Sequence, residues 1–159
     1  MSIDPRAFRQ TVGQFVTGVT VIVMDVEGEV RAMTANSFTS LSLNPPLVLF
    51  CLGKGTKAGQ SIGDVQEFSV NILSQDQQVL STYFAGVQGS DPPPFSFTRT
   101  SGAPLLDGCV AALGCLVYAV YEGGDHWIVV GEVAAMHASD EPRSPLVFFG
   151  GKYSALEEV

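Results

Sequence analysis

Residues 111–137 read AALGCLVYAVYEGGDHWIVVGEVAAMH, and this stretch determines the fold. β-Branched, aromatic and leucine side chains fill 111–120 and 126–137, a composition that favours β-strands. Between them, Glu122-Gly123-Gly124-Asp125 places two glycines where a tight hairpin turn needs a left-handed backbone. We therefore expect two long antiparallel strands joined by a hairpin.

The expected strand 111–120 is apolar on both of its faces. Its side chains alternate between two apolar sets, Leu113, Cys115 and Val117 on one side and Leu116, Tyr118 and Val120 on the other. One set can fill the interior of a barrel, whereas the other set must be covered by another surface, and a second copy of the chain is the simplest candidate. Of the 159 residues, 46% are hydrophobic and 15% charged, yet no apolar run approaches the ~20 residues of a membrane span. We predict a homodimer that does not enter the membrane.

Further strands and a few helices follow from the periodicity of the remaining apolar residues. Strands are expected at 19–23, 30–33, 47–52, 68–73 and 146–149, and helices at 3–16, 57–63 and 74–84. Asp4-Pro5 and Ser74 are the expected starts of the first and third helices, and the third carries Val79, Leu80, Tyr83 and Phe84 on one side. Residues 86–101, with Gly89 and Pro92-Pro93-Pro94, are expected to form a loop. This pattern predicts one mainly β domain over residues 1–159, a small antiparallel barrel with peripheral helices.

Charge and cysteine content argue against nucleic-acid binding and against a metal site. The formal net charge is −8 without any cluster of lysine and arginine, which argues against a nucleic-acid partner. Cys51, Cys109 and Cys115 form no Cys-x-x-Cys pair, and His126 and His137 stand apart from them, so no metal site is expected. Three reduced thiols and an N-terminus without signal-peptide features indicate a cytoplasmic protein.

A segment without charge suggests the ligand. Residues 33–47, MTANSFTSLSLNPPL, offer hydroxyl and amide groups in a turn between two apolar runs. The longer stretch 30–63 contains no carboxylate but has three cationic residues, Arg31, Lys54 and Lys57. An anion would not be repelled there. We predict a small aromatic ligand that carries phosphate.

Two short motifs have a functional and an ordinary interpretation. Gly53-Lys54-Gly55-Thr56-Lys57-Ala58 could wrap a phosphate, or it could be a solvated loop. The Rossmann interpretation is rejected because the chain lacks the expected parallel βαβ unit. In Gly124-Asp125-His126, the carboxylate could orient the imidazole, or the histidine could simply stand at a strand edge.

The chain resembles the short-chain flavin reductase family, the reductase components of two-component flavin-dependent monooxygenases. The resemblance runs from about Phe8 to Tyr153 and lies in the ordered set of motifs rather than in any one of them. The motifs are Thr17–Val21, Met33–Ser42, Pro45-Pro46-Leu47, Phe68–Leu73, Pro104-Leu105-Leu106, Gly124-Asp125-His126 and Pro145-Leu146. The resemblance implies an antiparallel Greek-key split β-barrel that is usually homodimeric. It also implies reduction of FMN or FAD by NADH or NADPH, with the reduced flavin diffusing to a partner oxygenase.

The resemblance also assigns residues to the site. It implies that the flavin ring and ribityl chain contact Thr34, Ala35, Asn36 and Ser37, with Ser40 and Ser42 close by. Cys51 and Leu52 would pass along the flavin, Thr56 and Lys57 would meet its phosphate, and Phe84 would border the site. His126 would face the nicotinamide, chiefly to position it and less as a proton donor, and Tyr153 would close that pocket.

Other functions remain open at this stage. A tightly held flavin would make the protein an FMN-dependent electron carrier or oxidase. A non-catalytic split-barrel module would bind flavin or haem without consuming NADH, and a barrel kept for dimerisation with an oxygenase would bind no flavin. FMN versus FAD, NADH versus NADPH, and the role of Pro92–Pro94 are not resolved by the residues.

Overall fold

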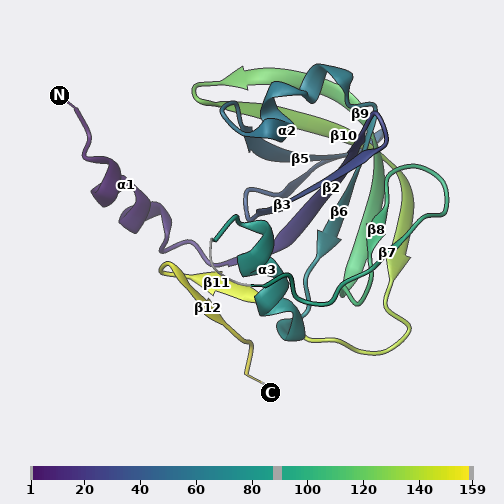
Figure 1. Ribbon diagram of the computed structural model, residues 1–159. Coiled ribbons are helices and arrows are strands. Elements are labelled where there is room, and N and C mark those ends of the chain that lie inside the picture. Colours follow the sequence, from purple (N-terminus) through teal and green to yellow (C-terminus); the bar gives the residue numbers. More distant parts are fainter. Residues whose placement is uncertain (1, 88–90, 158–159) are drawn as a thin grey trace.

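The hairpin of the two longest strands dominates the sheet. A computed structural model describes residues 2–87 and 91–157, and in it β9 (Ala111–Gly123) pairs antiparallel with β10 (His126–Ala138) (Figure 1). Gly124 in the turn has φ of +67°, a conformation that glycine adopts without strain. The expected hairpin is therefore confirmed, and the first strand is three residues longer than expected.

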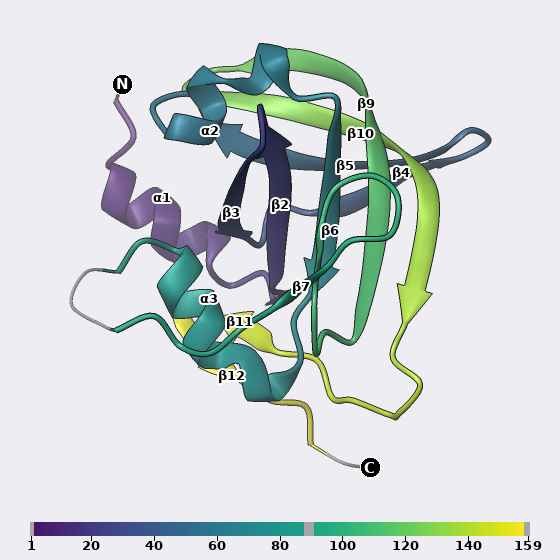
Figure 2. The same cartoon turned by 45° about the vertical axis from the view of Figure 1, so that its right-hand side comes forward.

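Seven strands form one curled antiparallel sheet. Their order is β3 (Glu29–Ala35), β2 (Thr20–Val26), β6 (Glu67–Ile72), β9, β10, β5 (Pro46–Gly53) and β4 (Thr39–Leu43). Figure 2 shows the sheet closing around its core, with α2 at one end and α3 at the other. The mainly β architecture with few helices is confirmed.

Smaller elements complete the structure. They are β1 (Thr17–Gly18), β7 (Phe97–Thr98), β8 (Leu105–Leu106), β11 (Val147–Phe149) and β12 (Lys152–Ser154), together with α1 (Pro5–Val12), α2 (Lys57–Gln60), η1 (Ile62–Asp64), η2 (Gln75–Gln77) and α3 (Gln78–Phe84). Strands β1, β11 and β12 form a second sheet, and β7 pairs with β8. The segment predicted as a loop over 86–101 thus contains a short strand, while Gly89 lies outside the described residues.

The barrel interior is filled by buried side chains of the central strands. Phe50 and Phe68 meet edge to face with ring centroids 5.1 Å apart. Asn71 is fully buried on β6; its amide nitrogen donates to the Val21 carbonyl at 3.0 Å, and its oxygen accepts from the Leu106 N–H at 2.8 Å. A buried amide with its hydrogen bonds satisfied joins β2, β6 and β8 without a desolvation penalty.

All three expected helices differ from expectation, and the one expected at 57–63 divides into α2 and η1. Helix α1 ends at Val12 rather than at residue 16, and Asp4 caps it by accepting from the N–H groups of Arg6 and Ala7. The 3-10 turn η2 precedes α3, and on α3 Leu80 and Ser81 are buried whereas Val79 is exposed, so the buried face is not the one expected. Among the described residues, no helix has the length and apolar character needed to span a membrane.

Candidate functional site

A cleft of about 590 Å³ lies between α1 and the segment that follows β3. Asn36, Ser37 and Thr39 line one side, and Phe8 and Val12 of α1 line the other. None of its lining residues carries a carboxylate, and Arg9 is the only charged one. The cleft therefore combines apolar walls with uncharged hydrogen-bonding groups, and this surface suits an aromatic ring with polar edges.

A smaller cleft of about 180 Å³ adjoins the first, sharing Asn36 and Phe148 with it. Thr34 donates through Oγ1 to the Ser81 carbonyl at 2.6 Å, and the Ser81 hydroxyl lies 2.7 Å from the Tyr153 hydroxyl. Buried Ser81 thus fixes two residues that the resemblance assigned to the site. Sequence reasoning missed Ser81, because its partners Thr34 and Tyr153 lie 47 and 72 residues away in the sequence.

Ser37 lines the larger cleft and connects it to β5. Its hydroxyl accepts from the Cys51 N–H at 3.0 Å and donates to the Cys51 carbonyl at 3.3 Å. Since side chains alternate along a strand, Cys51 and Gly53 face outward, whereas Phe50 and Leu52 are fully buried. Leu52 is fully buried, main chain included, so the structure gives it no surface on which to contact a ligand, contrary to what the resemblance implied.

Gly53, two residues further along β5 than Cys51, lies beside Thr56 and His126. Thr56 Oγ1 donates to the Gly53 carbonyl at 2.8 Å and accepts from the Gly59 N–H at 2.9 Å, which caps α2. His126 pairs with Gly53 in the ladder, and a Cβ on Gly53 would lie 3.9 Å from His126 Nε2. Two residues of strand separate Gly53 from Cys51, or about 7 Å. Thr56 and His126 therefore lie together, one short step from the Ser37 contact.

His126 and Asp125 form an exposed pair with Nδ1 and Oδ1 2.7 Å apart. The hydrogen bond to His126 holds the pKa of Asp125 below its usual value, so the carboxylate stays ionised near neutrality. An ionised acceptor favours the proton on Nδ1, which leaves Nε2 on the Gly53 side as the acceptor. The hydrogen bond to Asp125 therefore holds the imidazole of His126 in one orientation, with Nε2 toward Gly53.

Eight of the thirteen assigned residues line neither of the two clefts: Ser40, Ser42, Cys51, Leu52, Thr56, Lys57, Phe84 and His126. His126 lines neither cleft, so a single chain does not bring it together with Tyr153 as the resemblance implied. Phe84 also lines neither; it packs with the second core cluster and meets Phe95 edge to face at 5.1 Å. Ser40 and Ser42 lie on β4, where they pair with Val48 and Leu47, respectively.

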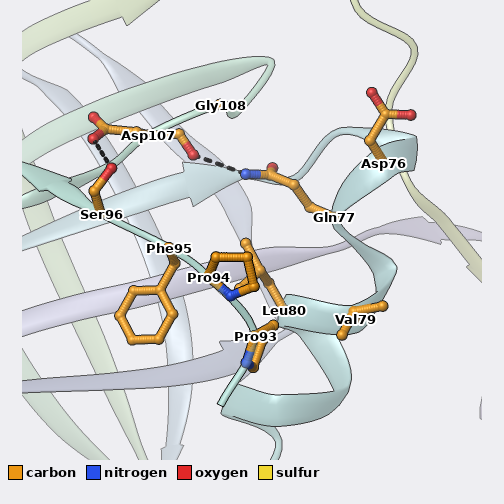
Figure 3. A pocket seen from close by; sticks show the side chains of 10 residues that line it. All are labelled: Asp76, Gln77, Val79, Leu80, Pro93, Pro94, Phe95, Ser96, Asp107 and Gly108. Carbon is orange, nitrogen blue, oxygen red and sulfur yellow. Dashed lines mark hydrogen bonds between the residues drawn. The ribbon is translucent and has the colours of Figure 1, made fainter. Parts of the chain in front are cut away.

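A separate cavity of about 470 Å³ lies on another side of α3 (Figure 3). Its lining includes Leu80, Pro93 and Phe95, and the carboxylates of Asp76 and Asp107. Gln77 donates to the Asp107 carbonyl at 2.9 Å. None of the lining residues is cationic, so a phosphate-bearing ligand is disfavoured here relative to the Asn36 cleft.

The curled antiparallel sheet is the split β-barrel expected from the sequence, and comparisons with known proteins place it in a family. The model of the "Flavin reductase like domain" family matches residues 12–157. The chain therefore belongs to the flavin reductase-like family.

Individual relatives agree over nearly the whole chain. An NADH-dependent FAD reductase of Streptomyces globisporus is 41% identical, with 95% of this chain and 87% of that protein covered. The reductase subunit HsaB of a flavin-dependent monooxygenase from Rhodococcus jostii is 39% identical, with 98% and 80% covered. The solved structure of the flavin reductase PheA2 in its native state superposes with a TM-score of 0.91 at 42% identity, covering 98% of this chain and 100% of that one.

Proposed function

We propose that this protein is an NAD(P)H-dependent flavin reductase that reduces FMN or FAD and supplies reduced flavin to a partner monooxygenase. The observation that carries the proposal is the order of groups along β5. The carboxylate-free cleft at Asn36 is followed by the Ser37–Cys51 hydrogen bonds and then by Gly53 and Thr56. A tricyclic ring at the cleft with a phosphate-bearing tail toward Thr56 suits this order of polarity.

The names of the relatives support the same activity. Besides the proteins described above, an NADH-dependent flavin reductase of a Rhodococcus species is 37% identical over 98% of this chain. A solved structure 38% identical to the chain is titled an NADH:FAD oxidoreductase in complex with NAD and FAD fragments. These names favour NADH over NADPH and leave both flavins as substrates to test.

The flavin supplies the hydride chemistry when bound, and the protein supplies position and polarity. Asn36 and Ser37 present donors and acceptors at the cleft, while the carboxylate-free lining leaves growing negative charge on a reduced ring without repulsion. Phe8, Val12 and Phe148 give the same cleft apolar walls. His126 positions the nicotinamide, with Asp125 fixing its tautomer.

The protein is proposed to act as a homodimer of single-domain chains in the cytoplasm. Helix α1 buries none of its residues, and Leu116 and Tyr118 on β9 are about half exposed, so apolar surface is available for a second copy. The family model spans most of the chain, which supports one domain. The described cysteines are free thiols, consistent with a reducing compartment.

The function is tested by measuring oxidation of NADH and NADPH with FMN, FAD and riboflavin, each with and without the protein. Turnover that requires both protein and added flavin supports the proposal. No protein-dependent oxidation with any flavin contradicts it and favours a non-catalytic flavin- or haem-binding module.

A flavin-dependent electron carrier or oxidase is the second candidate. It would hold its flavin as a prosthetic group, so purified protein would stay yellow after extensive dialysis. Colourless protein that is active only with added flavin would exclude this candidate.

A further inference from the structure

The Arg31 side chain bridges β3 and both ends of α2. One nitrogen, Nη1, donates to the Lys57 carbonyl at 2.9 Å and to the Ser61 hydroxyl at 2.9 Å. Lys57 is the first residue of α2, and Ser61 is its C-terminal cap. A single guanidinium group thus holds the whole turn against the neighbouring strand.

Helix α2 depends on such contacts because it has only four residues. A helix of one turn has too few internal hydrogen bonds to be stable alone. On its other side, Trp127 Nε1 donates to the Gly59 carbonyl at 3.1 Å. A Cβ on Gly59 would lie only 2.0 Å from the Gly53 carbonyl oxygen, so the turn packs directly on the end of β5. Arg31 and Trp127 therefore fix the turn from β3 and β10, respectively.

The charge of Arg31 is only weakly compensated. Its contacts on α2 are a neutral carbonyl and a neutral hydroxyl, and Glu29 lies 3.4 Å away with a mostly exposed side chain. Solvent screens such an exposed pair. The guanidinium thus leaves positive potential beside Thr56 and Lys57, where the proposed function places the flavin phosphate.

We propose that Arg31 is a positioning residue for the phosphate end of the flavin. It does not touch the flavin; it holds the turn that presents Thr56 and Lys57, and it adds positive potential there. The inference rests on the proposed function, because that function makes this turn the phosphate contact. Sequence reasoning counted Arg31 only as one cation among three in the segment 30–63.

The test compares flavins with and without phosphate. Arg31→Gln is expected to raise the Kd for FMN and FAD about three- to tenfold, in the range of one ordinary net hydrogen bond, because Arg31 acts without touching the flavin. Riboflavin, which has no phosphate, should bind with a Kd within about twofold of wild type. Quenching of flavin fluorescence measures these constants without nicotinamide, and KM values from turnover should show the same split.

Two further variants separate positioning from general stability. Arg31→Lys keeps a donor and the charge, so it should recover part of the FMN affinity. Ser61→Ala removes one acceptor and should weaken FMN binding less than Arg31→Gln does, with the effects of the two changes less than additive when combined. Arg99→Gln is the matched control, because Arg99 forms a surface pair with Asp25 at 2.9 Å.

Unchanged FMN affinity in Arg31→Gln would overturn the inference, and so would an equal loss for FMN and riboflavin, which indicates lost packing. Either result leaves flavin reduction by the wild type intact. Conversely, wild-type protein that binds flavins but oxidises no NADH would refute the proposed function while the binding constants still decide the role of Arg31.

Discussion

At the scale of single residues, the most specific arrangement is the exposed pair of His126 and Asp125. Because the carboxylate holds Nδ1, the ring is oriented beside Gly53 rather than free to rotate. We predict that His126→Ala raises the KM for NADH about tenfold, the value of one well-placed contact, and changes the KM for flavin by less than about twofold. Steady-state kinetics with either substrate varied measures both constants.

Asp125→Asn is the control for this prediction. The amide keeps the size of the side chain but removes the carboxylate charge that faces His126 Nδ1, so the tautomer is less constrained. An intermediate rise in the KM for NADH is expected. If His126→Ala weakened flavin and NADH equally, the assigned role of His126 would be wrong.

The buried thiols predict a pH dependence of stability. Burial raises the pKa of Cys109 to about 11 and that of Cys115 to about 12, from 9.0. Above pH 9 the unfolded chain releases these protons and the folded chain retains them, so the free energy of unfolding falls as pH rises toward the folded-state values. Urea unfolding between about pH 7 and about pH 10 should show this fall, and Cys115→Ala should reduce its slope. An identical slope in the variant would show that Cys115 contributes nothing to it.

Residue identity alone indicated the polar turn of the candidate site, but not the residues that hold its surroundings in place. Thr34, Asn36 and Ser37 could be singled out because an uncharged polar turn between apolar runs is unusual in a chain of net charge −8. Ser81 and the bridging role of Arg31 were not predictable in this way. Their importance comes from contacts across 47 and 26–30 residues of sequence, which depend on how β3, α2 and α3 pack.

At the scale of elements, strands with their own apolar pattern were predictable, and those defined by a partner were not. β9 and β10 have long apolar runs and a glycine turn between them. β1, β7 and β8 have two residues each, so only their pairing identifies them. β4 contains Ser40 and Ser42 and was interpreted as part of a turn, because its polar side chains hide its pairing with β5.

The pairing of β9 and β10 leads to a prediction about two glycines. A Cβ on Gly131 of β10 would lie 2.3 Å from Phe68 Cζ and 3.0 Å from Cys115 Cβ, in a fully packed core. Gly131→Ala should destabilise the fold by roughly 1–3 kcal/mol through overpacking. For a chain of this size, that lowers the Tm by roughly 2–4 °C per kcal/mol.

Gly114→Ala on β9 is the matched control. Its Cβ would meet only the Cβ of Ala135, at the ordinary distance of 3.5 Å. This change should be neutral or stabilising by about 0.4–1 kcal/mol, since alanine restricts the unfolded chain. Thermal unfolding measures the Tm of both variants. Equal losses of Tm in Gly131→Ala and Gly114→Ala would contradict the packing argument.

At the scale of the whole molecule, the assigned residues fall into separate regions of one chain. Asn36 and Tyr153 line the clefts between α1, β3 and α3, whereas Thr56 and His126 meet at the end of β5. The outward-facing residues Cys51 and Gly53 of β5 lie between these regions, and the proposed flavin would span them. No comparable connection joins Tyr153 to His126 within the described residues, so closure of the nicotinamide pocket stays a prediction for the assembled protein.

The predicted homodimer is tested by mass in solution. Leu116 and Tyr118 are 47% and 54% exposed on β9, and an exposed apolar surface of this kind favours association. Light scattering should give twice the chain mass of 16.8 kDa. Leu116→Glu with Tyr118→Glu should shift the protein toward the monomer, because charges in an apolar interface are costly to bury. Leu156→Glu, at an exposed residue near the C-terminus, should leave the mass unchanged. A wild-type monomer would refute the dimer, and a dimer that survives the double change would place the interface elsewhere, with α1 the next surface to test.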